Sequence, residues 1–594
     1  MKSAIKIFKI TGVLLAAVIV ISSCQKFSAL NTNPNAITPA NAAPDYLMAS
    51  VLTQAATQYG NLGSGQMSGA MQQTAQDAFG GSYSMYDWET SDWTSYYNAL
   101  RDNKLLLQKA QANNWKFHQG VALIMRAFIF GTIADLWGDA PDSMAVKGDE
   151  GGLANEFPTF DSQQSMYNGV IADLKAAIPF LSGTMSDHPE ITAVTSSSDV
   201  FYAGDPTEWT KVAYSLLLRY YLRLSPKMDE QANVEAVAPY VFASNDDDWA
   251  MSFPGKDANS SYQKASTFSG ASNFNRNKMS ATLTYALAAL KDPRIVIMAQ
   301  PVTTPSRVDG TKFSPGDDST LTTIIGGIRY INPNATNVPG AIAKYKQFDP
   351  NTYATDRPWG AALGTVWSFY DTASVYVGIP ISYSYNDFSY NINGVGTQAN
   401  SNNSYVSYLR NDIYNATSGP LLKQRMASYN EICFDLAEAA LKGWNVGGTA
   451  EQWYYAGIQA SFDLWTVFSN YQSDVNNYYG CVKTYNDYIA QSAVAYNGTL
   501  QQIIQQKWIA SWQASVESYM DWRRTGYPAI SVGWASYRDA IPLRFAYYNT
   551  ELQNNPTNSA AAIALLAPTA YNGPDGNNSA WSKTWLLQGL TIPY

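Results

Sequence analysis

Long apolar helical patterns toward both ends of the chain constrain its fold most strongly. The stretch GVALIMRAFIFGTIADLWGD, residues 120–139, carries apolar side chains on nearly every side of a helix, so such a helix must be buried on most sides. Arg126 is the exception, and we expect it to pair with a carboxylate or a helix end. Further helical patterns occupy residues 46–57, 94–112, 162–181, 208–224, 279–290, 428–444, 450–465 and 500–524.

Residues 300–425 have a different character. Asn, Ser, Thr, Gly, Asp and Tyr dominate there, and helical periodicity is weak. A loop-rich segment of that length inside a compact domain is usually functional. The sequence therefore predicts one domain over 46–594, with a helical scaffold mainly at 46–300 and 425–594 and a loop-rich variable part at about 300–425. Small residues at the seams of the C-terminal helices suit stacked helical hairpins, although no clean repeat period is visible.

The first residues have the pattern of a bacterial export signal. Three lysines and no acid precede an apolar run at 10–21, which is too short for a membrane span of about 20 residues. The letters ISSC then resemble a lipobox, in which the cysteine receives the lipid. We predict a lipoprotein signal peptide at 1–23, lipid attachment at Cys24 and a polar tether at 24–45. The alternative is an ordinary signal peptide followed by an incidental cysteine.

Composition excludes several classes of function. The net charge is −9, or −12 without Lys2, Lys6 and Lys9, and no run of Lys or Arg remains, which argues against a nucleic-acid ligand. The chain has two histidines, His118 and His188, so a His-based catalytic triad and a zinc site are disfavoured. No cofactor is expected. Cys433 and Cys481 could form a disulfide, but Cys433 lies in an apolar helical pattern and is expected to behave as a small hydrophobic residue.

Several blocks of sequence resemble one family. They are RAFIFGTIADLWGDAPDS (126–143), YAGDPTEWTKVAYSLLLRYYLRL (202–224), YNEICFDLAEAALKGW (429–444) and QQIIQQKWIASWQASVESYMDWRRTGYP (501–528). They are similar to the SusD/RagB family of nutrient-binding outer membrane lipoproteins of Bacteroidota, in the starch-binding-associated subgroup. The resemblance extends from Cys24 to the C-terminus.

The resemblance implies a fold, a partner and a role. The fold is mainly α, with a tetratricopeptide-like helical superhelix that supports a loop-rich variable subdomain. The partner is a SusC-like TonB-dependent outer membrane transporter, to which a lipid-anchored protein facing the cell exterior delivers captured oligosaccharides without being an enzyme. The alternatives are a RagB-like member that captures peptides, and a structural lid subunit that does not contact the nutrient. A surface glycoside hydrolase would need two carboxylates across the scissile bond, and no acid pair lies in a recognisable active-site setting.

Two aromatic loops are candidate ligand sites, because sugars bind aromatic faces rimmed by polar groups. The first contains Tyr83, Tyr86, Trp88 and Trp93, and the second contains Tyr383 and Tyr385. The resemblance favours the first loop. The alternative for each ring is packing on the scaffold.

Other conspicuous residues are expected to be structural. Trp137, Trp209, Trp508 and Trp522 lie inside the helical motifs and are predicted to pack in the core. The acidic run NDDDW at 245–249 could hold calcium but lacks the glycine and terminal glutamate of an EF-hand loop, so a solvated turn is favoured. Arg523 and Arg524 are expected to face a helix C-terminus or to pair with acids such as Asp521.

Overall fold

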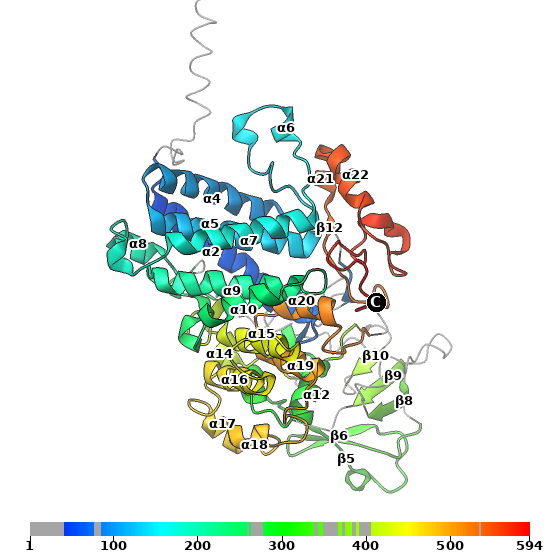
Figure 1. Ribbon diagram of the computed structural model, residues 1–594. Coiled ribbons are helices and arrows are strands. Elements are labelled where there is room, and N and C mark those ends of the chain that lie inside the picture. The colour runs from blue at the N-terminus through cyan, green and yellow to red at the C-terminus, as the bar shows by residue number, and fades with distance from the viewer. Residues whose placement is uncertain are drawn as a thin grey trace, which may run out of the picture.

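The chain folds as a mainly α protein, as predicted (Figure 1). The computed structural model describes residues 41–76, 85–88, 90–257, 260–262, 277–337, 342–347, 366–370, 375–382, 388–390, 405–533 and 536–594. The predicted lipid site at Cys24, together with Tyr83, Tyr383 and Tyr385, lies outside these residues.

The helices follow the apolar patterns closely. The helix predicted at 94–112 is found at Thr94–Ala112, and Gly443, with φ +86°, follows the end of the helix that starts at Tyr429. The helices are α2 (Pro44–Ser64), α3 (Gln66–Ala70), α4 (Thr94–Ala112), α5 (Lys116–Trp137), α6 (Leu153–Glu156), α7 (Gln163–Phe180), α8 (Ala193–Ser198), α9 (Pro206–Leu224), α10 (Gln231–Val237), α12 (Ala281–Ala289), α13 (Ile295–Met298), α14 (Asn411–Tyr414), α15 (Tyr429–Leu441), α16 (Ala450–Leu464), α17 (Gln472–Asn477), α18 (Tyr485–Ile489), α19 (Leu500–Ala510), α20 (Val516–Thr525), α21 (Asn549–Asn554) and α22 (Pro556–Ala564).

Helix α5 lies at the centre of the N-terminal helical layer. It packs against α2, α4, α7 and α9, while α15 packs against α16, α19 and α9 (Figure 1). Within the described chain, α5 is the one helix long and apolar enough to cross a membrane, but nearly all of it is buried by these neighbours. Arg126, on α5, makes the expected ion pair, donating from Nε to Asp173 at 2.6 Å.

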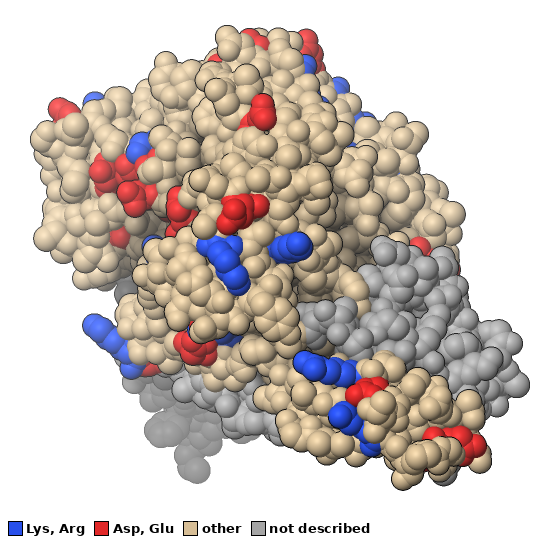
Figure 2. Space-filling model, turned by 90° about the horizontal axis from the view of Figure 1, so that it is seen from below, with Lys and Arg blue, Asp and Glu red and all other residues tan. Residues whose placement is uncertain are grey.

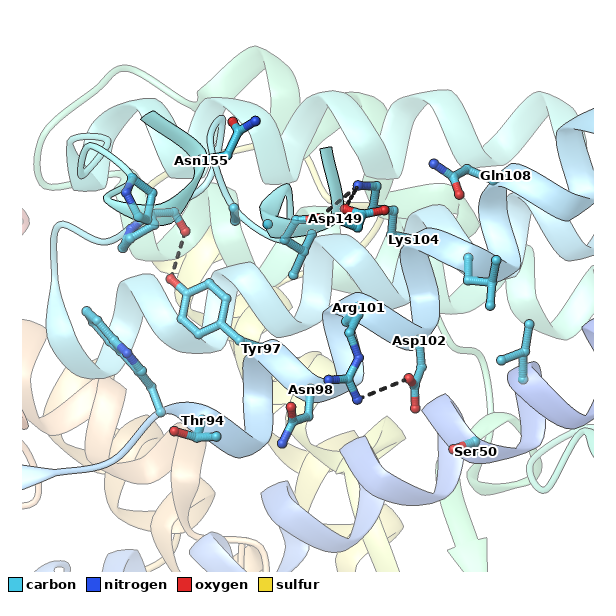
Figure 3. Close-up of a pocket in the computed structure, with 18 of the residues that line it drawn as sticks. Ser50, Thr94, Tyr97, Asn98, Arg101, Asp102, Lys104, Gln108, Asp149 and Asn155 are labelled. Carbon is cyan, nitrogen blue, oxygen red and sulfur yellow. Dashed lines mark hydrogen bonds and ion pairs between the residues drawn. The ribbon is translucent and has the colours of Figure 1, made fainter. Parts of the chain in front are cut away.

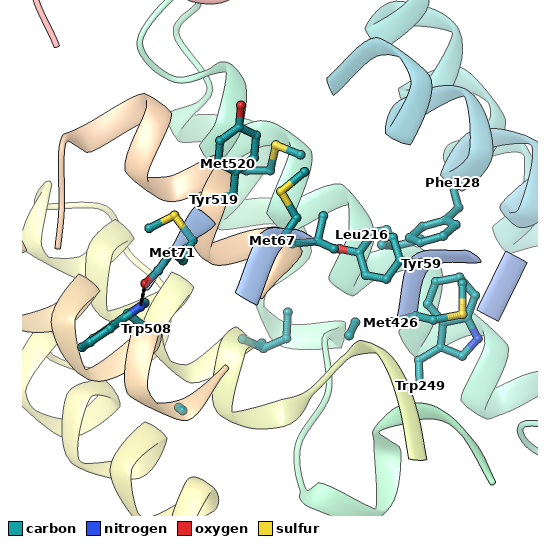
Figure 4. Packing of buried hydrophobic residues seen from close by; sticks show 14 of the residues in the cluster. Tyr59, Met67, Met71, Phe128, Leu216, Trp249, Met426, Trp508, Tyr519 and Met520 are labelled. Atoms are coloured by element: carbon teal, nitrogen blue, oxygen red, sulfur yellow. Dashed lines mark hydrogen bonds between the residues drawn. The ribbon is translucent and has the colours of Figure 1, made fainter. Parts of the chain in front are cut away.

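One hydrophobic core joins the N-terminal and C-terminal helices (Figure 4). Phe128 of α5 stands between Tyr59 and Trp249, with ring centroids 5.0 and 4.9 Å away. Trp508 of α19 donates from Nε1 to the carbonyl of Met71 at 2.8 Å, which ties the two ends of the chain together. The tryptophans predicted to be structural, Trp137, Trp209, Trp508 and Trp522, are all buried.

Short strands connect distant parts of the chain. The loop-rich region forms two three-stranded sheets, ordered β5-β7-β6 and β10-β9-β8, which the weak periodicity did not predict because each strand is only a few residues long. Outside that region, β1 pairs with β4, β11 with β3, and β12 with β2. The strands are β1 (Thr74–Gln76), β2 (Thr90–Ser91), β3 (Trp249–Ser252), β4 (Asn277–Met279), β5 (Ser306–Val308), β6 (Thr322–Ile325), β7 (Ile328–Ile331), β8 (Ile342–Gln347), β9 (Val366–Tyr370), β10 (Phe388–Tyr390), β11 (Lys423–Ala427) and β12 (Ala546–Tyr547).

A ladder of buried ion pairs runs between five helices. Arg223 of α9 contacts Asp135 of α5 and Glu517 of α20, and both acids are buried. One turn earlier, Arg219 donates from Nε to Glu431 of α15 at 2.8 Å. Because each cation contacts acids from different helices, the ladder fixes how these helices lie against one another.

The ladder continues into the C-terminal helices. Lys507 of α19 contacts Asp435 at 2.6 Å and Asp521 at 2.7 Å. Arg524 donates to Glu438 at 2.6 Å and to Asp521 at 3.0 Å, which confirms the expected pairing with an acid. The neighbouring Arg523 donates to the main-chain carbonyls of Asp135 and Leu543 instead.

The acidic run at 245–249 is engaged by the protein itself. Asp247 is buried, accepts hydrogen bonds from the amides of Ala243 and Ser244, and pairs with Lys211 at 2.7 Å. The solvated turn predicted there is therefore wrong for Asp247, whose carboxylate closes a structural turn. Asp248 accepts from the amide of Tyr429 at 2.7 Å, and burial raises the pKa of its carboxyl to about 7. Cys433 and Cys481 are both buried free thiols.

Replacing Arg223 by methionine should destabilise the fold strongly. The change leaves Asp135 and Glu517 buried without their shared cation, which typically costs about 3–5 kcal/mol. Urea unfolding measures the loss. Arg307→Met, at an exposed position of β5, is the control and should change the free energy of unfolding by less than about 0.5 kcal/mol. Equal effects of the two changes would contradict the role given to the ladder.

Asp248 should make the fold less stable as the pH rises. Its pKa is about 7 in the folded chain and about 3.9 in an unfolded one, so the unfolded chain releases the proton first as the pH rises between these values. Asp248→Asn can still accept from Tyr429 and removes the titration. Urea unfolding should therefore show that the free energy of unfolding falls less between pH 5 and pH 8 in the variant than in the parent. The exposed neighbour Asp246→Asn is the control, and a loss in Asp248→Asn equal to that of the parent would refute the assignment.

Candidate functional site

A groove of about 1220 Å³ runs along α4 (Figure 3). The start of α2 forms one wall and the loop at 141–158 forms the other. The segment from Tyr548 to Asn555, which includes α21, closes one end. The groove therefore combines segments from the N-terminal, central and C-terminal parts of the sequence.

The pairing of β12 with β2 explains why these segments meet. Ala546 pairs with Thr90 and Tyr547 with Ser91 in parallel register. Tyr548, directly after β12, is thereby brought to Trp93, shortly after β2, with ring centroids 6.1 Å apart. Helix α21 follows and carries Glu551 to the same end of the groove.

Aromatic rings form this end of the groove. Trp93 is 3% exposed and lies 5.6 Å from Tyr97 and 5.7 Å from Phe160, measured between ring centroids. The Tyr97 hydroxyl donates to the carbonyl of Pro141 at 2.7 Å, which fixes the ring beside the loop wall (Figure 3).

One face of α4 supplies the polar floor. Thr94, Tyr97, Asn98, Arg101, Lys104, Leu105 and Gln108 line the groove at the spacing of three to four residues that places side chains on one side of a helix. The opposite face is buried and includes Leu100 and Leu106. The side chains of Asn98 and Gln108 make no hydrogen bond within the described chain, so their donors and acceptors are free for a ligand. None of these residues was among the predicted ligand residues, which include Trp93 beside them, although the period of the face is visible within the predicted helix.

Ion pairs hold the loop wall and neutralise both cations of the groove. Lys104 donates to the carbonyl of Val146 at 2.8 Å and to Asp149 and Glu150 at 3.0 Å each. The hydrogen bond from Lys104 lowers the pKa of Asp149. Arg101 lies 3.7 Å from Asp102 and is largely exposed (Figure 3).

Glu551 is the acid at the aromatic end. Its Oε1 accepts from the side-chain amide of Asn555 at 3.2 Å, and partial burial raises its pKa, against the effect of that hydrogen bond. Within the described chain no lysine or arginine forms an ion pair with it. Asn555 itself also donates to the carbonyl of Pro158, which joins α21 to the loop wall.

The predicted aromatic residues divide into three groups. Tyr86 is buried and donates to the carbonyl of Ala70 at 3.0 Å, and Trp88 is buried between Tyr519 and Phe545. The exposed platform expected from these two rings is not formed, because the scaffold covers them. Trp93 is also buried but lines the groove. Tyr83, Tyr383 and Tyr385 lie outside the described residues, so their predicted contact with ligand stays a prediction.

The face of the molecule in Figure 2 shows no continuous basic patch, and the described residues form no metal centre. On the face shown in Figure 2, acidic and basic side chains are scattered among uncharged ones. No group of three His, Cys, Asp or Glu side chains in the described part of the chain is placed to hold a metal ion. The groove thus offers amides, hydroxyls, a carboxylate and aromatic rings, which suit a polar ligand with apolar patches.

Comparison with known proteins identifies the family. The chain matches a SusD-like family, described as starch-binding and associating with the outer membrane, over residues 34–347 and 371–548. No curated protein matches it.

Solved structures share the fold. A SusD homolog from Bacteroides fragilis has a TM-score of 0.64 at 19% identity, covering 92% of this chain and 99% of that one. A SusD/RagB family protein from Bacteroides thetaiotaomicron has a TM-score of 0.59 at 20% identity, covering 92% and 100%. A chitin-binding protein has a TM-score of 0.60 at 21% identity, covering 92% and 99%. The extent of the family match confirms the resemblance found in the sequence, and the chain belongs to the SusD-like family.

Proposed function

We propose that this protein is a lipid-anchored, nutrient-binding protein of the outer membrane that captures oligosaccharides in the α4 groove. It passes them to a SusC-like TonB-dependent transporter and carries out no chemistry on them. The anchor is a lipid on Cys24, and the protein faces the cell exterior.

The groove is the observation that carries the proposal. Sugars present hydroxyl groups and flat apolar C–H faces, so their sites combine hydrogen-bonding side chains with aromatic rings. The amides of Asn98 and Gln108 have no partner in the described chain, and the partly exposed Tyr97 forms an aromatic end, where it packs on the buried ring of Trp93. A volume of about 1220 Å³ is large enough for several sugar rings.

The family supports the membrane and transport parts of the proposal. The matching family is described as starch-binding and associating with the outer membrane, and a structurally similar protein binds chitin. The residues ISSC, which resemble a lipobox, favour a lipid anchor on Cys24. The resemblance to SusD/RagB proteins favours a SusC-like transporter as the partner.

Removing the free amides of α4 should weaken oligosaccharide binding. Asn98→Ala together with Gln108→Ala removes two sets of hydrogen bonds, each worth roughly 0.5–1.5 kcal/mol, so the Kd should rise about five- to a hundred-fold. Calorimetric titration of the detergent-solubilised full-length protein against neutral oligosaccharides measures the change. Gln111→Ala, exposed on α4 outside the groove, should leave the Kd unchanged. Binding that is insensitive to the double change would place the site elsewhere. Binding to peptides alone would favour RagB-like capture, and binding to nothing would favour a structural lid.

Cys24→Ala should release the protein from the membrane. Lipid chains hold a protein through about 0.8 kcal/mol per buried methylene, and without the thiol no chain is attached. Fractionation should find the parent in the outer membrane together with a co-purifying TonB-dependent transporter, and the variant in the soluble fraction. Cys481→Ala, which removes a buried thiol, is the control. A variant that still sediments with the outer membrane would refute lipidation at this residue.

A further inference from the structure

The aromatic end of the α4 groove contains a carboxylate that the protein leaves without a cation, and this bears on the ligand if the groove is the capture site proposed above. Glu551 is partly buried, and its one hydrogen bond to a side chain comes from Asn555 at 3.2 Å. No lysine or arginine in the described ranges pairs with it. A carboxylate that is partly removed from water favours a positively charged partner.

Two tyrosines, Tyr97 and Tyr548, line the groove together with this carboxylate. Burial, and then the charge of Glu551, raise the pKa of Tyr97, and the same charge contributes to the raised pKa of Tyr548 after burial and the nearby Asp92. Trp93 packs edge-on against both tyrosine rings, at 5.6 and 6.1 Å between centroids. The electron-rich faces of such rings attract cations. The lining of the groove therefore combines a carboxylate with aromatic side chains that pack on one another.

The cations elsewhere in the groove are already engaged. Lys104 is held by Asp149 and Glu150, and Arg101 lies beside Asp102. Glu156 also lines the groove and forms no ion pair within the described chain. With four acids and two bases among the lining residues, the groove carries a negative excess that repels anionic ligands.

We propose that the aromatic end of the groove binds the ammonium group of an amino sugar, so that the captured nutrient is an oligosaccharide with free amino groups. The ammonium donates to the open oxygen of Glu551 and lies against the tyrosine rings. The rest of the chain contacts the amides along α4, and uronic-acid oligosaccharides are excluded by the acids of the groove.

A neutral hydroxyl at the same place would form a hydrogen bond to Glu551 but would leave its charge unpaired. An ammonium adds the attraction between two opposite charges to its hydrogen bond, whereas a hydroxyl group offers the carboxylate only a dipole. An ammonium should therefore be preferred over the acetylated amine of the same sugar by about ten-fold or more in Kd, which corresponds to about 1.4 kcal/mol.

The experiment compares three tetrasaccharides by calorimetry with the detergent-solubilised full-length protein. They are a β-1,4-glucosamine tetramer, its fully N-acetylated form and a galacturonic acid tetramer, with a tri-lysine peptide as a source of amines that is not a sugar. The variants are Glu551→Gln and, as a control for net charge, Glu451→Gln, an exposed position on α16. Thermal unfolding checks that Glu551→Gln remains folded.

The expected result is a Kd for the glucosamine tetramer at least ten-fold lower than for the acetylated tetramer, with no binding of the galacturonic acid tetramer. The ratio of the two Kd values should fall to near one in Glu551→Gln and should stay at ten or more in Glu451→Gln. The preference should also weaken as the pH falls through the raised pKa of Glu551, because the protonated carboxyl no longer attracts the ammonium.

Four outcomes would overturn this inference. Equal binding of both tetramers, or a preference retained in Glu551→Gln, would do so while leaving oligosaccharide capture standing. Tighter binding of the peptide than of the glucosamine tetramer would assign the ammonium site to peptides. If no oligosaccharide binds, including neutral ones of other linkages, the proposed function itself would be overturned.

Discussion

The buried ladder of ion pairs is the constraint on which the arrangement of the scaffold depends. Arg219, Arg223, Lys507 and Arg524 each contact acids, and those acids come from α5, α15 and α20. Charges removed from water are tolerated only when their partners are held in good geometry. These directional contacts add to the apolar packing, because each cation must lie beside its acids.

The contacts of that scaffold determine the shape of the groove. Helix α5 is fixed by the ladder through Asp135, and α4 packs on α5 with its apolar face, which turns its polar face outward. The C-terminal wall is placed by the pairing of β12 with β2, and the loop wall by the contacts of Lys104 and Asn555. Each wall thus rests on contacts between residues far apart in the sequence.

These long-range contacts also explain what the sequence could predict. Periodicity gave the helix at 94–112 with its bounds, and motif tryptophans such as Trp508 were correctly expected in the core. The acids of α15 and α20 do not show in the sequence which cation they will contact, so the ladder was not foreseen. Trp93 was named as a ligand residue, but its neighbours Tyr548 and Glu551 come from the other end of the chain, and no local pattern connects them. Tyr86 and Trp88 were named as ligand candidates because their segment lies on no clear core helix, but tertiary packing covers both rings, as the alternative of packing on the scaffold implied.

The contrast between the ladder and the groove separates charges that stabilise from charges that can bind. In the ladder, each acid that contacts a cation is buried and forms its contact within the chain, so it has little left to offer a ligand. Glu551 is only partly buried, has one amide partner and faces a large open groove. Partial burial of Glu551 costs free energy, and the hydrogen bond from the Asn555 amide does not recover all of it. Selection for stability alone would therefore not favour this placement of the carboxylate. Such local disagreement with the rules that govern the rest of the fold is expected at a site that is completed by its ligand.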